Sequence, residues 1–200
     1  MQALWNEKFS RKGFLYGLEP NSFIASCTSK FPANGRVLCL GEGEGRNAIY
    51  LAKQGFMVEA LDASDVGLQK LQQRANQDNL SIIMRHTMLE SWEAPYPYDT
   101  VITSYMHLAK SKQPMFFAKA LRALKPKGLF VGEVFSTKQL AYTSGGPKDV
   151  NLLYALEDIY PIINALECRI LRISEEIVDL DEGEGHKGEA CVLRFILEKQ

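Results

Sequence analysis

Short apolar runs alternate with longer helical patterns between Val37 and Phe135 of this 200-residue chain. The apolar runs cover residues 37–40, 57–61, 81–85, 99–105 and 128–135. The helical patterns cover residues 46–54, 64–77 and 113–124. Strand–helix–strand alternation predicts parallel strands joined by right-handed crossovers. We therefore expect an open, doubly wound α/β sheet, with another α/β topology as the alternative.

The end of the chain breaks this alternation. A helical pattern at 149–166 is followed by two strand-like runs, at 168–180 and 189–200. The segment between these runs, "DEGEGHKG", has no room for a helix, and a parallel crossover needs about a dozen residues or more. The two runs are therefore predicted to be antiparallel neighbours. The sequence thus predicts a seven-stranded, mostly parallel sheet with one antiparallel strand at the C-terminus.

The charge and hydropathy patterns argue against several classes of partner. The formal net charge is -1 and the basic residues are scattered, whereas a nucleic-acid surface needs clustered Lys and Arg. No apolar run approaches the roughly 20 residues that cross a bilayer, and the N-terminus lacks the apolar core of a signal peptide. We expect one cytoplasmic domain, a monomer or weak homodimer, with no nucleic-acid or membrane partner.

The four cysteines, Cys27, Cys39, Cys168 and Cys191, lie far apart and form no Cys-x-x-Cys pair. Their spacing indicates neither a disulfide framework nor a metal site. Cys39 and Cys191 lie within apolar strand-like runs, where cysteine behaves as a small buried hydrophobe. We therefore expect reduced cysteines and no bound metal.

Three glycines, Gly41, Gly43 and Gly45, directly follow the first predicted strand. In an open parallel sheet, ligands bind beyond the carboxyl ends of the strands. Glycine there permits positive φ and lets the backbone approach a ligand closely. The dinucleotide fingerprint is G-x-G-x-x-G, and its third glycine would fall at Arg46. The turn therefore predicts a nucleotide-like ligand other than a dinucleotide, with an ordinary tight turn as the alternative.

Asp62 ends the second predicted strand. A carboxylate at this position can accept hydrogen bonds from both ribose hydroxyls of an adenosine. NAD-dependent enzymes use the same arrangement, so Asp62 indicates adenosine without choosing the cofactor. The alternative is a surface or helix-capping aspartate, although Ser64 and Asp65 compete for the cap.

Five blocks of sequence carry a further signal: "YGLEPNSF" (16–23), "LCLGEGEGRNAIYLAKQGFMVEALDAS" (38–64), "LKPKGLF" (124–130), "GGPKD" (145–149) and "DEGEGHKGEA" (181–190). Together they resemble bacterial class I S-adenosylmethionine-dependent methyltransferases of the tellurite-resistance/thiopurine type, over nearly the whole chain. The resemblance implies a Rossmann-like three-layer sandwich, S-adenosyl-L-methionine as methyl donor and S-adenosyl-L-homocysteine as product.

The resemblance also implies a division of the single domain, residues 1–200, into three segments. Residues 1–30 are expected to form a helical lid, 36–135 the cofactor-binding core, and 136–200 the substrate-side helix and C-terminal hairpin. Trp5, Phe9, Tyr16 and Phe23 are candidates for the apolar face of the lid. The alternative is that they pack on the edge of the sheet.

The resemblance places the cofactor against Gly41, Glu42, Gly43, Gly45, Asn47, Asp62, Ala63, Met88, Leu89, Ser104 and Tyr105. Two departures from the family pattern matter. Cys39 stands where an aspartate is common, so Glu42 is the better partner for the methionine ammonium group, with Glu44 solvated. Met88 stands near the usual adenine-binding acid or amide, so adenine is expected to contact Met88 and the backbone of Leu89. Ser104 and Tyr105 are expected under the methionine portion.

Two histidines are candidate substrate-side residues. Methyl transfer depends mainly on positioning, and a base is needed only when the nucleophile must lose a proton. His107 follows the fourth predicted strand at the mouth of the cleft, and His186 lies in the hairpin turn that can fold over the cofactor. The alternative for His186 is a solvated turn, and His86 is expected to be structural. Lys148 would favour an anionic substrate.

Three functions are compatible with these features. The first is a methyltransferase acting on a small molecule, with an oxyanion, a thiol or another compound as acceptor. The second is an NAD(P)-dependent oxidoreductase, against which the glycine spacing, the C-terminal hairpin and the missing Tyr-x-x-x-Lys pair all count. The third is a fold relative that binds S-adenosylmethionine without catalysis.

Overall fold

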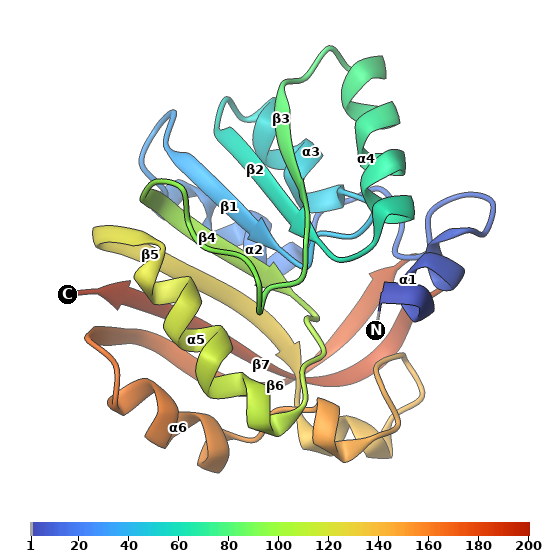
Figure 1. The fold of residues 1–200 in the computed structure, drawn as a ribbon. Helices are drawn as coiled ribbons and strands as arrows, with labels where there is room; N and C mark the ends of the chain where they lie inside the picture. The colour runs from blue at the N-terminus through green and yellow to red at the C-terminus, as the bar shows by residue number, and fades with distance from the viewer. Residues whose placement is uncertain (1) are drawn as a thin grey trace.

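A computed structural model describes residues 2–200 (Figure 1). Its strands form one seven-stranded sheet in the order β3-β2-β1-β4-β5-β7-β6. The strands are β1 (Arg36–Leu40), β2 (Met57–Asp62), β3 (Ile82–His86), β4 (Tyr98–Ser104), β5 (Leu124–Phe135), β6 (Cys168–Glu182) and β7 (His186–Lys199). The helices are α1 (Gln2–Phe9), α2 (Ser22–Cys27), α3 (Arg46–Lys53), α4 (Asp65–Gln77), α5 (Gln113–Arg122) and α6 (Leu156–Asn164). No helix in the described part of the chain has the length and apolar composition that crossing a membrane requires.

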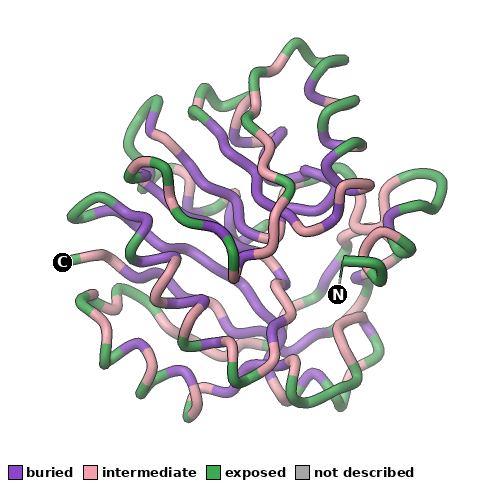
Figure 2. Tube along the Cα trace, in the orientation of Figure 1, coloured by how far each residue is buried: buried purple, intermediate pink, exposed green. Residues whose placement is uncertain are grey.

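Helices cover both faces of the sheet, as Figure 1 shows. One apolar cluster joins the sheet to α5 and α6 and includes Phe116 and Ile159. A second cluster joins the opposite face to α2, α3 and α4 and includes Ile24, Leu51 and Leu71. Figure 2 shows the same layering, with the central strands buried and the outer helix surfaces exposed. The predicted three-layer sandwich is therefore confirmed.

Among the described strands, β7 is the one that runs in the direction opposite to all the others. It pairs antiparallel with β5 on one side and with β6 on the other, while the other ladders are parallel. The turn between β6 and β7 covers residues 183–185, so no parallel crossover is possible. The prediction of one antiparallel C-terminal strand is confirmed, and both strands reach closer to the turn than expected.

The predicted helix at 149–166 is wrong in its first half. A short 3₁₀ turn covers Val150–Leu152, and α6 begins only at Leu156. Between them Tyr154 is extended beside β5, where its N–H donates to Phe135 O at 3.0 Å and its side chain is fully buried. Tertiary packing at the end of β5 therefore overrides the local helical pattern.

The start of β5 also differs from the expectation of residue 128. Leu124 already pairs with Tyr98, and the next paired residues are Leu129 and Thr100. The residues between Leu124 and Leu129 bulge out of the ladder, and Lys127 has a φ of 67°. The "KPKG" segment therefore bends a strand that has already begun.

The order of the strands fixes where a ligand can bind. Strand order reverses between β1 and β4, because β2 and β3 lie on one side and β5 on the other. The loops that follow β1 and β4 therefore leave the sheet in opposite directions and open a crevice at the carboxyl ends of these strands. In Figure 1, α1 lies at this edge of the sheet.

Candidate active site

A cavity of about 100 Å³ lies at the carboxyl ends of β1, β2 and β4. The structure brings ten of the sequence-predicted site residues to its wall: Gly41, Glu42, Gly43, Gly45, Asp62, Ala63, Ser104, Tyr105, His107 and His186. Trp5, Phe9 and Tyr16 of the N-terminal segment also line it. The wall therefore combines a bare backbone turn, several carboxylates and an aromatic cluster.

The glycine turn adopts a backbone that other residues rarely adopt. Gly41, Gly43 and Gly45 have φ angles of 64°, 59° and 89°, all in the left-handed region that favours glycine. A Cβ on Gly45 would lie 2.3 Å from Leu71 Cδ1, so this glycine lets the turn pack on α4. The turn leads directly into α3 at Arg46.

The two glutamates inside the turn have different roles. Glu42 is buried, and its Oε1 accepts a hydrogen bond from Ala48 N at 2.7 Å. Burial raises the pKa of Glu42 to about 7, although the Ala48 N–H and the Arg46 charge lower it. Glu44 is also buried, contrary to the expectation of a solvated side chain. It pairs with Lys70 at 2.7 Å and accepts from Leu15 N at 2.7 Å, which anchors the N-terminal loop.

Asp62 stabilises the glycine turn. Its Oδ2 accepts from Gly43 N at 2.8 Å, and its Oδ1 accepts from Ser64 N at 2.7 Å. The cap of α4 is Ser64, whose Oγ accepts from Gly67 N, so Asp62 is not the capping residue. Burial raises the pKa of Asp62. Each carboxylate oxygen keeps a second lone pair that a ligand hydroxyl can use.

Three predicted cofactor residues do not reach the cavity wall. Asn47 is buried behind it, where its Nδ2 donates to Ser104 Oγ at 3.0 Å. Leu89 packs in the apolar cluster under α5. Met88 begins a tight turn in which its carbonyl accepts from Trp92 N at 3.1 Å. Contact of these three residues with a cofactor stays a prediction.

Tyr105 follows β4 with a φ of 53°, a left-handed conformation that is strained for a residue with a side chain. Its hydroxyl donates to Glu133 Oε1 at 2.6 Å. Its ring stacks on Phe135, with centroids 4.6 Å apart, and meets the edge of His186 at 4.3 Å. Burial raises the pKa of Tyr105 well above its ordinary value, so the phenol stays protonated.

Both candidate histidines lie among aromatic rings. His107 stacks between Trp5 and Phe135, each with centroids 6.0 Å away. Burial lowers the pKa of His107 to about 3, so the imidazole is neutral at physiological pH. His186 is only 2% exposed, which contradicts the alternative of a solvated turn. His86 lies outside this cluster, with Nε2 3.1 Å from Ala63 O.

Arg46 is the main site residue that the sequence reasoning missed. Its Nη2 pairs with Glu182 Oε2 at 2.9 Å. Its Nη1 is buried and has no hydrogen-bond partner in residues 2–200, although Arg46 lines the cavity. Such a donor can bind an anionic group of a ligand. The sequence signal is "GEGRN", in which an arginine directly follows the last glycine of the turn.

The N-terminal segment covers the glycine turn. A Cβ on Gly43 would lie 2.9 Å from Phe9 Cζ, so the Phe9 ring rests on the turn. Asn6 fixes α1 further, because its Oδ1 accepts from Ser64 Oγ at 2.7 Å. Trp5, Phe9 and Tyr16 thus gather at the cavity as a lid face would. Phe23 does not join them, since it packs in the core under α2.

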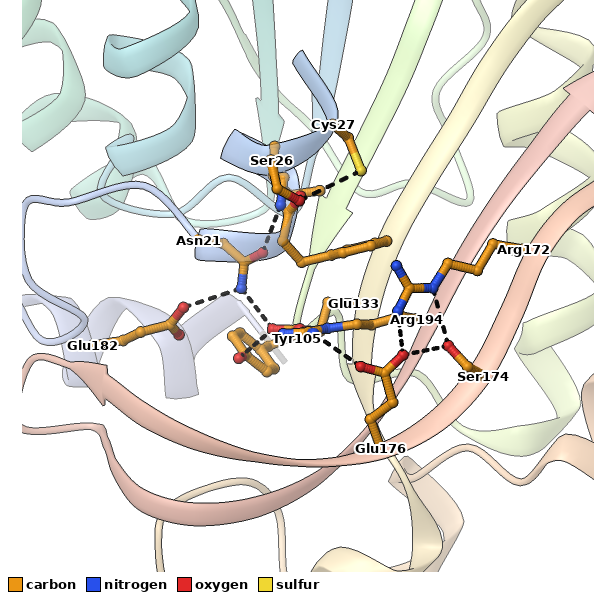
Figure 3. A network of polar contacts seen from close by, with 12 residues as sticks. Asn21, Ser26, Cys27, Tyr105, Glu133, Arg172, Ser174, Glu176, Glu182 and Arg194 are labelled. Atoms are coloured by element: carbon orange, nitrogen blue, oxygen red, sulfur yellow. Dashed lines mark hydrogen bonds and ion pairs between the residues drawn. The ribbon is translucent and has the colours of Figure 1, made fainter. Parts of the chain in front are cut away.

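A buried polar network (Figure 3) includes Tyr105, which lines the cavity. Glu133 on β5 is fully buried. It accepts hydrogen bonds from Asn21 Nδ2 and Tyr105 Oη, each at 2.6 Å, and from Arg194 Nε at 2.5 Å. Asn21 also donates to Glu182 Oε1 at 3.0 Å. The network therefore connects the cavity wall to β5, β6 and β7.

Lys148 does not support an anionic substrate. Its Nζ donates to Tyr142 O at 3.2 Å, and it is not among the residues that line the cavity. The loop that carries it approaches the C-terminal hairpin instead, where Ser144 O accepts from Lys187 N at 2.9 Å.

Comparison with known proteins supports one family. Residues 37–128 match the model of a family described as methyltransferase domain. The chain is 29% identical over 111 residues to a ubiquinone biosynthesis O-methyltransferase of Rickettsia akari, a match that covers 54% of this chain and 43% of that protein. A second such protein, from Rickettsia bellii, is 25% identical over 70% of this chain. The chain spans 43% and 61% of the lengths of these two relatives.

Solved structures agree in fold. TehB from Haemophilus influenzae superposes with a TM-score of 0.73 at 16% identity, over 100% of this chain and 67% of that one. A S-adenosylmethionine-dependent methyltransferase from Clostridium acetobutylicum superposes with a TM-score of 0.70 at 14% identity, over 98% and 97%. The matched domain, the sheet order and the glycine turn at the switch point lead to one assignment. Residues 37–128 match a methyltransferase domain, and the chain as a whole has the fold of solved S-adenosylmethionine-dependent methyltransferases.

Proposed function

We propose that the protein transfers a methyl group from S-adenosyl-L-methionine to a small, uncharged molecule. The observation that carries this proposal is the unpartnered Nη1 of Arg46, buried beside a glycine turn at the switch point of the sheet. An amino-acid carboxylate satisfies that donor, and S-adenosylmethionine carries one. The O-methyltransferase names of the Rickettsia relatives support the same activity.

The residues of the cavity fit the parts of this cofactor. When bound, S-adenosylmethionine supplies a sulfonium methyl group and leaves as S-adenosylhomocysteine. Arg46 Nη1 binds the carboxylate, and Glu42 pairs with the ammonium group. Asp62 and Ala63 hold the ribose, Ser104 and Tyr105 line the methionine portion, and the bare turn from Gly41 to Gly45 admits the ligand. Asn47, Met88 and Leu89 remain predicted cofactor contacts.

The wall on the substrate side favours a neutral acceptor over an oxyanion. Among the described residues, Arg46 is the one lysine or arginine that lines the cavity, and it is paired with Glu182. The part of the wall around the two histidines is aromatic, because Trp5 stacks on His107 and Tyr16 packs on His186. Thiols, phenols and other small hydroxyl compounds fit these surroundings better than tellurite does. His107 and His186 would contact the acceptor.

We infer that the N-terminal segment acts as a lid over the core of residues 36–135. Phe9 packs on the glycine turn, and Asn6 holds α1 to the start of α4. With α1 docked, the cavity measures about 100 Å³, and ligand pockets usually measure about 300–1,000 Å³. Entry of the cofactor therefore requires α1 to move. We also propose that the protein acts in the cytoplasm as a monomer or weak homodimer.

Titration calorimetry tests this function. The purified protein is titrated with S-adenosylhomocysteine and, in parallel, with NAD. We expect binding of S-adenosylhomocysteine only, because the turn lacks the dinucleotide spacing. Binding of NAD alone would favour the oxidoreductase, and binding of neither would contradict the proposed cofactor. A screen of phenols, thiols and oxyanions for methylation then separates an active enzyme from a binding protein without catalysis.

A further inference from the structure

Glu182 is a buried carboxylate that contacts both Arg46, on the cofactor side of the cavity, and His186, on the substrate side. Its Oε2 lies 2.9 Å from Arg46 Nη2 and 3.3 Å from His186 Nδ1. Its Oε1 accepts from Asn21 Nδ2 at 3.0 Å (Figure 3). The side chains of Arg46, Glu182 and His186 are 8%, 9% and 2% exposed. Little water competes with these contacts, so the carboxylate holds both partners in place.

The imidazole of His186 has a fixed orientation. The rings of Tyr16, Tyr105 and Phe135 surround it, with centroids 4.4, 4.3 and 5.0 Å away. In a neutral imidazole one nitrogen carries the proton and the other accepts, and the hydrogen bond of the first decides which is which. With Glu182 facing Nδ1, the proton belongs on Nδ1. Nε2 is then left as the acceptor.

Charged and titratable groups face His186 from each element around it. They are Glu182 on β6, Glu133 on β5, Arg46 on α3, Tyr16 in the N-terminal loop, and Tyr105 and His107 after β4. Burial lowers the pKa of His186 most, Arg46 lowers it further, and the two glutamates raise it, with a net lowering. Of these groups, Glu182 is the one that forms an ion pair or hydrogen bond with both Arg46 and His186.

We propose that Glu182 is a positioning residue that couples the cofactor side of the site to the substrate side. It holds His186 by Nδ1 so that Nε2 can take the proton from an acceptor hydroxyl or thiol, and it holds Arg46 so that Nη1 faces the cofactor carboxylate. The proposal rests on the methyltransferase function proposed above. It narrows the acceptor to a molecule whose nucleophilic atom carries a proton.

The proton and electron pairs balance in this scheme. The O–H or S–H bond of the acceptor breaks, and its proton goes to His186 Nε2. The released electron pair forms the new bond to the methyl carbon, while the old carbon–sulfur pair remains on the sulfur of the leaving product. His186 then returns its proton to water. Glu182 stays ionised throughout, because Arg46 and His186 hold its pKa at about 2 despite its burial.

Nuclear magnetic resonance of the histidine side chains tests the proposal without a known acceptor. The neutral tautomer and the pKa of His186 are measured in the wild type and in Glu182→Gln, with and without S-adenosylhomocysteine, and His186→Gln assigns the signals. Glu184→Gln is the matched control, because Glu184 lies on the same hairpin but is 77% exposed and pairs with Arg11. Calorimetry with S-adenosylhomocysteine accompanies each variant.

We expect the Nδ1–H tautomer in the wild type and a pKa of His186 that falls by roughly one unit in Glu182→Gln. Bound S-adenosylhomocysteine should raise the pKa of wild-type His186, because its carboxylate offsets the Arg46 charge. This rise should be smaller in Glu182→Gln, and Glu184→Gln should match the wild type. An Nε2–H tautomer in the wild type, or an unchanged His186 in Glu182→Gln, overturns the proposal. Absent binding of S-adenosylhomocysteine by the wild type would contradict the proposed function, while the tautomer would still decide the role of Glu182.

Discussion

At the scale of single residues, Glu42 and Asp62 show how one cavity gives two carboxylates different properties. Both are about 8% exposed. Asp62 accepts two backbone N–H bonds, one on each oxygen. Glu42 accepts one from Ala48 N, and its pKa is raised to about 7. Glu42 is therefore the group whose ionisation a bound cation can shift near neutral pH.

This difference predicts proton-linked cofactor binding. An ammonium group beside Glu42 favours the ionised carboxylate and lowers its pKa below the free value of about 7. Below that pH, binding must release a proton, so the affinity for S-adenosylhomocysteine should rise from about pH 6 to about pH 8. Calorimetry in buffers of different ionisation enthalpy measures the released proton. Glu42→Gln should bind more weakly and lose this pH dependence; an equally pH-dependent variant would assign the proton to another group.

Replacing Asp62 should weaken the binding of the cofactor. Asp62→Asn places an amide against the N–H of Gly43 or Ser64 and removes the charged acceptor for the ribose. We expect S-adenosylhomocysteine to bind about 1.5–3 kcal/mol more weakly, or roughly 10- to 150-fold. Asp78→Asn is the control, because Asp78 lies at the far end of α4 and pairs with Lys53. Equal affinity in the two variants would remove Asp62 from the cofactor site.

The sequence located residues near the glycine turn better than residues brought in from elsewhere. Asp62 and Tyr105 follow strands whose carboxyl ends share one edge, so position along the strand was enough to place them. Glu182 and Asn21 are far from the turn in sequence. The pairing of β6 with β7 places Glu182 beside Arg46, and the course of the N-terminal loop places Asn21 beside Glu182. No pattern in the local sequence predicts these contacts.

At the scale of elements, hydrophobic periodicity correctly predicts the helices and strands that local sequence determines. It fails where packing against a neighbouring element determines the backbone conformation. The strands from β1 to β4 and the helices α3, α4 and α5 appear close to their expected positions. The segment before α6 has apolar residues at helical spacing as well, but Leu153 and Tyr154 are instead drawn into the core beside β5. Burial of those side chains outweighs one turn of helix.

The docking of α1 predicts slow release of the cofactor. Phe9 is 4% exposed on the glycine turn, whereas Leu4 on the same helix is 53% exposed. Phe9→Ala should loosen the lid and raise the dissociation rate of S-adenosylhomocysteine about tenfold, the effect of losing ~1.4 kcal/mol. Leu4→Ala, as the matched control, should leave the rate unchanged. Stopped-flow displacement measures both rates, and equal rates in the two variants would mean that α1 does not gate the site.

At the scale of the whole molecule, Glu133 joins segments that are distant in sequence. It receives hydrogen bonds from the N-terminal loop, from the end of β4 and from β7. Glu133→Gln leaves Arg194 with a weakened partner in the interior, and we expect the free energy of unfolding to fall by about 3–5 kcal/mol. Denaturant unfolding checks this loss. Glu189→Gln, an exposed change on β7, should have almost no effect, and a similarly small loss in Glu133→Gln would show that the network is not needed for stability.

The stability of the whole molecule should depend on pH through two groups of opposite sign. The folded pKa of His107 is lowered from 6.5 to about 3, so its contribution is complete above pH 6.5 and is lost as the pH falls toward 3. The folded pKa of Glu42 is raised from 4.5 to about 7, so its contribution is complete below pH 4.5 and is lost as the pH rises through 7. Between pH 4.5 and 6.5 the two contributions offset each other.

Replacing either His107 or Glu42 should therefore reveal the pH dependence of stability that the other group causes. Relative to the wild type, His107→Phe should become more stable as the pH falls from 6.5 to 4.5, because the ring still packs between Trp5 and Phe135 but no longer takes up a proton. Glu42→Gln should become less stable over the same range. Denaturant unfolding at several pH values measures both, with His86→Gln as an exposed control. Parallel pH profiles in wild type and His107→Phe would mean that His107 is not held neutral by the lid, and α1 would then not be closed over it in solution.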